Sequence, residues 1–130
     1  MRTPATVTQA EETTCTPAGD IPVRLRLGAD EAGRLAEACK ALGHPVRLQI
    51  VELLSRYGGQ VCVCEIERHF ALAQPTISHH LRVLRESGLV AAEQRGLWVY
   101  YDIQPEAIAR LRALLGEFET ASAGAPPVAL

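Results

Sequence analysis

Apolar residues recur every three to four positions in the first half of the chain, which predicts two successive helices. The first lies in the segment DEAGRLAEACKALG, with Asp30 as its expected N-cap and Gly43 after its end. Its inward positions are Leu35, Cys39 and Leu42. The second is expected to begin at Pro45 and to end at Gly58. Its buried stripe consists of Val46, Ile50, Leu53 and Leu54.

The helical pattern continues in two shorter segments joined by the turn ALAQ. The first follows the sequence VCVC and turns two apolar residues inward, Ile66 and Phe70. The second is expected to begin near Gln74 and Pro75 and to stop at Gly88. Its buried positions are Ile77, Leu81 and Leu84.

Beyond Gly88 the apolar residues no longer recur at helical spacing. The runs LVAAEQ and LWVYYDI flank Arg95-Gly96, and the second run is rich in β-favouring residues, so a β-hairpin is predicted. The last segment, PEAIARLRALLGEF, predicts a helix whose apolar face is broad for the end of a small domain. That face indicates a subunit interface, formed by Leu111, Leu115 and Phe118.

This order of helices and hairpin predicts a winged helix-turn-helix, mainly α with a small β-hairpin and homodimeric. We expect residues 1–28 to be a flexible N-terminal arm, because they carry Thr, Pro, Ala and Glu without periodicity. Residues 29–119 form the predicted DNA-binding and dimerisation domain, and residues 120–130 a disordered tail.

Composition places the chain among ordinary globular proteins, with 48% hydrophobic and 22% charged residues in 130. No apolar run is long enough for a membrane span and no secretory signal is evident, so a cytoplasmic location is expected. Thiols are kept reduced in that compartment, which favours metal binding or redox chemistry over a disulfide framework. The four cysteines are Cys15, Cys39, Cys62 and Cys64. Cys39 is predicted to be a buried structural residue.

The net charge of -2 does not indicate a nucleic-acid binder, but arginines and histidines gather between residues 68 and 95. Helical geometry places His79 and Arg82 opposite the buried stripe of their helix. The expected DNA contacts of this helix, to phosphates and to base edges of the major groove, are made by Gln74, Thr76, Ser78, His79 and Arg82. From the hairpin tip, Arg95 is expected to reach the DNA backbone or the minor groove. A merely solvated polar face is the alternative. His80 lies nearer the core and is predicted to pack or cap.

The cysteine pair restricts its own local structure. Residues two apart on a helix diverge by about 200°, so Cys62 and Cys64 can share an ion only where the chain is extended or begins to turn. We therefore predict a strand-to-helix junction at this point. Placement at a helix N-terminus also favours the thiolate form that binds metals.

Several of these segments together resemble one family. HPVRLQIVELL, VCVCEI, AQPTISHHLRVLRESGLV and RGLWVYYDI are similar to the ArsR/SmtB metal-responsive repressors, most closely those of arsenical-resistance operons, over roughly residues 30 to 118. The resemblance implies a homodimer that binds double-stranded operator DNA and dissociates when a soft metal or metalloid binds. An enzyme such as a thiol-based oxyanion reductase is not expected, because no Gly-rich loop accompanies a cysteine and no Cys-His pair is evident. The short apolar runs predict no contact with a membrane.

Two departures from the family bear on the effector. Many arsenic-responsive relatives carry a third cysteine where this chain has Glu67, and no histidine follows His80 to form the zinc site of other relatives. As(III) or Sb(III) is the expected effector, held by Cys62, Cys64 and Cys15 of the arm. Cd(II) or Pb(II) is the alternative effector, and oxidation of the cysteine pair in a redox sensor is a further one.

Overall fold

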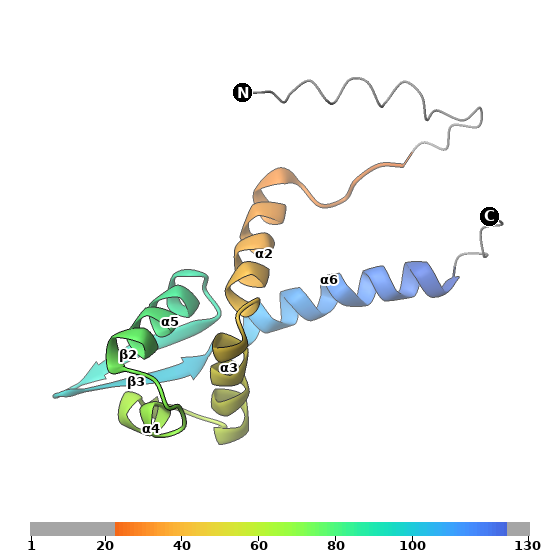
Figure 1. Cartoon of the computed structure of the whole chain (residues 1–130). Coiled ribbons are helices and arrows are strands. Elements are labelled where there is room, and N and C mark those ends of the chain that lie inside the picture. Colours follow the sequence, from red (N-terminus) through yellow and green to blue (C-terminus); the bar gives the residue numbers. More distant parts are fainter. Residues whose placement is uncertain (1–22, 125–130) are drawn as a thin grey trace, which may run out of the picture.

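The computed structural model describes residues 23–124, which form helices and a small sheet (Figure 1). The helices are α2 (Ala29–Leu42), α3 (Pro45–Tyr57), α4 (Val63–Arg68), α5 (Gln74–Glu86) and α6 (Pro105–Gly124). The strands are β1 (Val61–Cys62), β2 (Val90–Arg95) and β3 (Trp98–Ile103). This is the predicted winged helix-turn-helix. Within the described residues, no helix combines the length and apolar character needed to cross a bilayer.

The sheet is antiparallel, with strand order β1-β3-β2. Strands β2 and β3 form the predicted hairpin, and Gly96 takes the left-handed conformation its turn requires, with φ 63°. Strand β1 was not predicted as part of the sheet. It pairs with the other side of β3, so Val61 lies opposite Tyr101 and Cys62 opposite Tyr100. The chain entering α4 is therefore fastened to the hairpin.

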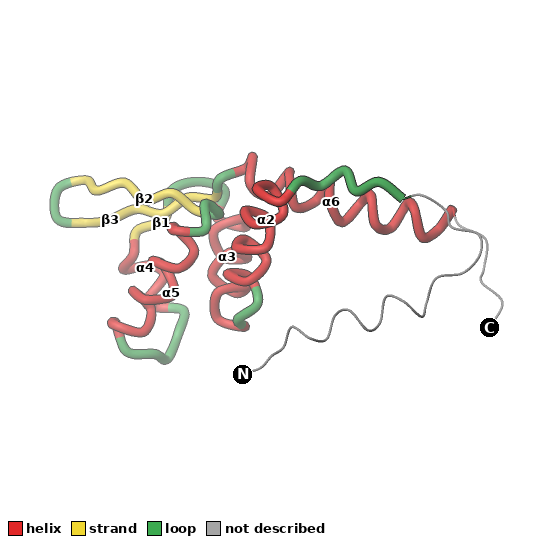
Figure 2. Tube along the Cα trace, turned by 90° about the horizontal axis from the view of Figure 1, so that it is seen from above, coloured by secondary structure: helices red, strands yellow, loops and turns green. Residues whose placement is uncertain are grey.

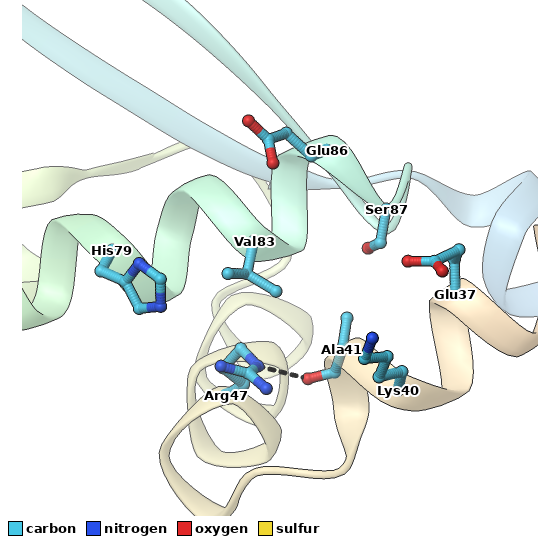
Figure 3. A pocket seen from close by; sticks show the side chains of 8 residues that line it. All are labelled: Glu37, Lys40, Ala41, Arg47, His79, Val83, Glu86 and Ser87. Carbon is cyan, nitrogen blue, oxygen red and sulfur yellow. Dashed lines mark hydrogen bonds between the residues drawn. The ribbon is translucent and has the colours of Figure 1, made fainter. Parts of the chain in front are cut away.

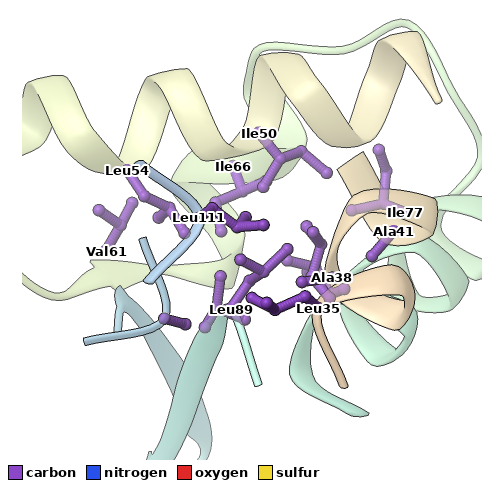
Figure 4. Packing of buried hydrophobic residues seen from close by; sticks show 14 residues of the cluster. Leu35, Ala38, Ala41, Ile50, Leu54, Val61, Ile66, Ile77, Leu89 and Leu111 are labelled. Carbon is purple, nitrogen blue, oxygen red and sulfur yellow. The ribbon is translucent and has the colours of Figure 1, made fainter. Parts of the chain in front are cut away.

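The core lies where the helices meet the base of this sheet (Figure 4). The predicted inward residues of α5, Ile77, Leu81 and Leu84, are all 0% exposed, as are Ile50 of α3 and Ile66 of α4. Burying each such side chain contributes about 1.5–3 kcal/mol. The helix-turn-helix is thus held by packing.

Helix α2 differs from its prediction in two respects. Its N-cap is Gly28, not Asp30. Asp30 lies inside the first turn, where its negative charge interacts favourably with the helix dipole but its side chain makes no capping hydrogen bond. Cys39 is exposed, so its predicted burial is wrong. The buried stripe follows Leu35, Ala38 and Ala41, and this turns the i+4 position after Leu35 outward.

Helix α6 and the hairpin leave the core in opposite directions (Figure 2). The helix continues past the predicted boundary at residue 119 to Gly124, although Thr120, Ser122 and Gly124 are weak helix formers beside Glu119, Ala121 and Ala123. Leu111 is 6% exposed and belongs to the core of its own chain, whereas Leu115 and Phe118 are each 59% exposed. Residues 1–22 of the predicted arm, which spans 1–28, and residues 125–130 of the predicted tail lie outside the described residues.

Candidate functional site

Helix α5 presents a polar face on the side away from the core. Arg82 donates a hydrogen bond from Nη2 to Nδ1 of His79 over 3.2 Å, so the two residues lie together, as their spacing predicts. Gln74, Thr76 and Ser78 are exposed near the helix start. The N-cap residue Ala73 offers no side-chain acceptor. Pro75 carries no N–H, and the N–H groups of Thr76 and Ile77 donate to the carbonyl of Ala73. Among the described residues, the Gln74 N–H is therefore the one in this first turn left for an anion such as a phosphate.

His80 is held on the inner side of the same helix, as predicted, and is 6% exposed. Arg47 of α3 donates from Nη1 to Nδ1 of His80 over 3.2 Å, and from Nε to the carbonyl of Ala41 over 2.6 Å. The ring of His44 lies 4.4 Å from that of His80, centroid to centroid. Burial first, then the charges of His44, Arg47 and His79, lower the pKa of His80. The neutral imidazole is the form that accepts from arginine.

Arg47 therefore joins the end of α2 to α5, a role that the sequence alone did not indicate. Figure 3 shows Arg47 reaching the Ala41 carbonyl below His79 and Val83 of α5. The hollow between these three helices has a volume of about 320 Å³ and is lined by both acidic and basic side chains. We assign no ligand to it.

The hairpin tip carries Arg95, the predicted wing contact. Its guanidinium lies over the ring of Tyr100, 4.9 Å from the centroid, and its Nη2 lies 3.7 Å from the carboxylate of Glu93. Leu97 of the turn and Trp98, the first residue of β3, are 91% and 51% exposed. The wing tip thus combines a partly paired cation with exposed apolar side chains.

The cysteine pair lies at a strand-to-helix junction, as predicted. Cys62 is the last residue of β1 and the N-cap of α4, and its sulfur accepts a hydrogen bond from the backbone N–H of Cys64 over 3.3 Å. The two Cα atoms are 5.2 Å apart, and the two sulfur atoms are paired as in a disulfide. Both side chains are only partly buried. As thiolates they face the same side of the chain, which suits them to share one soft ion.

A third ligand is not supplied by the described residues. Within 23–124, no set of three or more His, Cys, Asp and Glu side chains converges to hold a metal ion. Glu67 occupies the position of the family's third cysteine, one turn after Cys64, and among the described residues its Oε2 is buried without a hydrogen-bond partner. Cys15 lies outside the described residues, so its predicted place in the site stays a prediction.

Known proteins share this fold and parts of this sequence. Residues 44–92 match the family described as bacterial regulatory protein, arsR family. An uncharacterised helix-turn-helix transcriptional regulator of Methanocaldococcus jannaschii is 40% identical over 84 residues, which cover 65% of this chain and 93% of that protein. The arsenical resistance operon repressor of Escherichia coli is 46% identical over 66 residues, covering 51% of this chain and 56% of the repressor. A cadmium resistance transcriptional regulatory protein CadC homolog of Staphylococcus aureus is 35% identical over 92 residues, covering 69% of this chain and 75% of that protein.

Solved structures agree. A possible transcriptional regulator for arsenical resistance superposes with a TM-score of 0.58 at 33% identity, covering 70% of this chain and 98% of that one. A homodimeric winged helix-turn-helix domain of Mycobacterium bovis, a possible ArsR-family regulator, has a TM-score of 0.58 at 29% identity and covers 85% and 100%. With its helix-turn-helix, its wing and these relatives, the chain belongs to the ArsR family of bacterial regulatory proteins and is not an enzyme.

Proposed function

We propose that this protein is a repressor that binds operator DNA as a homodimer and is released when As(III) or Sb(III) binds its cysteine thiolates. The observation that carries the proposal is the position of Cys62 and Cys64 at the junction of β1 and α4. Helix α4 is the first helix of the helix-turn-helix, so an ion drawn between the two sulfurs acts on the start of the DNA-binding unit. The function requires reduced thiols, which the cytoplasm maintains.

The DNA-binding half of the proposal is supported by the polar face of α5. Its contacts are assigned to Gln74, Thr76, Ser78, His79 and Arg82, with Arg95 on the wing. A DNA-binding homodimer is also the form described for the Mycobacterium bovis neighbour. The exposed apolar residues of α6, Leu115 and Phe118, provide the interface in this chain.

The third ligand is proposed to be Cys15. As(III) favours three soft ligands, and the carboxylate of Glu67 is a hard one. Arsenic X-ray absorption tests the assignment. Three sulfurs are expected in the wild type and two in Cys15→Ser, together with weaker operator release. Three protein sulfurs and full release in that variant would contradict it.

Two other effectors have their own support. The relative of Staphylococcus aureus carries cadmium resistance in its name, and Cd(II) or Pb(II) also binds thiolates. The pairing of the two sulfurs favours a redox alternative, in which peroxide takes two electrons and two protons from the dithiol. That reaction leaves a Cys62–Cys64 disulfide and two water molecules.

One titration separates these possibilities. Reduced protein bound to operator DNA is titrated in parallel with arsenite, antimonite, cadmium, lead, zinc and peroxide, using the wild type and Cys62→Ser. Release by arsenite or antimonite at stoichiometric concentration, absent in Cys62→Ser, is the expected result. Release by cadmium and lead alone, or by peroxide alone, would replace the metalloid with the corresponding effector.

A further inference from the structure

Gln60, the residue before β1, bridges the cysteine-bearing strand and the wing. Its Nε2 donates to Oε1 of Glu93 over 2.8 Å, and its Oε1 accepts a hydrogen bond from Nη2 of Arg95. Arg95 also lies 3.7 Å from the Glu93 carboxylate, so the three side chains close a triangle. Two of its sides cross from the loop before β1 to strand β2, although β3 lies between these strands in the sheet.

The backbone provides a second link at the same place. Strand β1 contains only Val61 and Cys62, and Cys62 pairs with Tyr100 of β3. The Arg95 guanidinium lies over the ring of the same Tyr100. Cys62 is therefore the direct strand partner of Tyr100, the residue whose ring contacts the Arg95 guanidinium. The Gln60 triangle links the same two parts of the chain through side chains.

Because β1 has only two residues pairing with β3, ion binding at Cys62, its last residue, can displace it. Cys62 serves both as the end of β1 and as the N-cap of α4, with φ -63° and ψ 142°. Two thiolates that turn around one ion must reorient the Cys62 side chain, which now accepts from the Cys64 N–H. A shift of β1 along β3 changes the distance from Gln60 to its partners on β2. Such a shift would break the hydrogen bonds of Gln60 to Glu93 and Arg95, which both lie on β2.

We propose that Gln60 is the positioning residue that transmits effector binding at Cys62 and Cys64 to Arg95 of the wing. The inference rests on the proposed function, which supplies the effector and the role of the wing. In the effector-free form, Gln60 shares the Glu93 carboxylate with Arg95 and holds the guanidinium over Tyr100. When β1 moves, Arg95 loses one partner and pairs with Glu93 alone. A cation neutralised by its own carboxylate no longer contributes to phosphate binding.

The electrostatics of Glu93 agree with this arrangement. The hydrogen bond from Gln60 is the largest cause of its lowered pKa, ahead of the charge of Arg95. Gln60 therefore acts on the same carboxylate as Arg95 does. Because Arg95 and Glu93 are about half exposed, their contacts add little to folding stability and can be removed without unfolding the domain.

Gln60→Ala tests the proposal, with Gln94→Ala as the matched control. Gln94 also lies at the wing, but its side chain donates only to the carbonyl of Gly96, within its own turn. Arsenite binding is followed by sulfur-to-arsenic absorption, and operator affinity is measured with and without arsenite. Both variants should bind arsenite as the wild type does. The fold loss of operator affinity caused by arsenite should be at least about fivefold smaller in Gln60→Ala and unchanged in Gln94→Ala.

The fluorescence of Trp98 reports on the wing in the absence of DNA. It is the only tryptophan of the sequence, lies opposite Arg95 in the hairpin register and is 51% exposed. Arsenite should change its emission in the wild type and in Gln94→Ala, and should leave it unchanged in Gln60→Ala. A Gln60→Ala protein with the wild-type emission change and the wild-type loss of operator affinity would overturn the coupling alone. A wild type that binds no arsenite would overturn the proposed function, and the coupling with it.

Discussion

Arg82 is an exposed cation on α5 that packs against no core residue, since its contact is with His79 on the same face. Arg82→Ala should therefore weaken operator binding while leaving the unfolding transition unchanged. The loss of one phosphate contact should lower the slope of log affinity against log salt by about one unit. Filter binding or anisotropy over a salt series measures this slope. Wild-type affinity at every salt concentration would contradict the placement of α5 in the groove.

Glu67 holds a carboxylate where a thiolate would complete a three-sulfur site. One of its oxygens is buried without a hydrogen-bond partner among the described residues, so replacing the carboxylate removes no hydrogen bond from that atom. Glu67→Cys should tighten arsenite binding by roughly tenfold or more, since it adds a soft ligand one turn after Cys64. Competition for arsenite with a small dithiol measures the change, with Glu67→Ser as the control. Equal affinity in Glu67→Cys and Glu67→Ser would show that position 67 does not reach the ion.

His80 should make the folded state sensitive to acid. Its pKa in the folded protein lies below the ordinary value of 6.5, because it is buried and faces His44, the N-cap of α3, Arg47 of α3 and His79 of α5. As the pH falls below about 6.5, the unfolded chain binds a proton that the folded chain resists, so stability decreases toward the folded pKa. Urea unfolding of the wild type and His80→Gln between pH 5 and pH 8 measures the difference. The wild type should lose more stability than the variant on acidification, and parallel curves would rule this role out.

Among the elements, α6 extends beyond the core of its own chain and exposes Leu115 and Phe118. Leu115→Glu should dissociate the dimer without unfolding the subunit, because Leu115 is 59% exposed in the single chain. The buried charge at the interface would cost several kcal/mol. Sedimentation measures the effect. Ala113→Glu is the control, since this exposed residue lies about 200° around the helix from Leu115. A Leu115→Glu protein that remains dimeric would exclude this face.

Leu111 is a poor probe of the same interface. It was predicted to lie there, but at 6% exposure it packs into the core of its own chain. A charge at Leu111 would destabilise the subunit itself, so a loss of dimer would not identify the contact surface. The interface is therefore better tested at Leu115, one helical turn after Leu111.

For the whole molecule, the proposed release from DNA is a thermodynamic coupling between two sites of one dimer. If arsenite lowers operator affinity by some factor, saturating operator DNA must lower arsenite affinity by the same factor. Calorimetric titration of arsenite into free and operator-bound protein checks this equality. Equal arsenite affinity in both states would mean that the ion binds without controlling DNA binding.

Local patterns in the sequence were sufficient for most elements. Ile77, Leu81 and Leu84 recur at the helical period, so their common burial follows from the geometry of any helix. The pair Cys62 and Cys64 required an extended or turning segment for the same kind of reason, and the β1–α4 junction agrees. The family followed from several motifs in the correct order.

Only the tertiary structure decided which of several helical positions face the core and which distant residues meet. Cys39 and Leu35 are compatible with one stripe by spacing, but packing of α2 against α3, α5 and α6 buries Ala38 and Ala41 and leaves Cys39 exposed. The contacts of Gln60 with Glu93 and Arg95 span 33 and 35 positions, and no periodicity encodes them. They exist because β1 adds to the free side of β3, and strand pairing depends on how the whole chain closes rather than on local sequence.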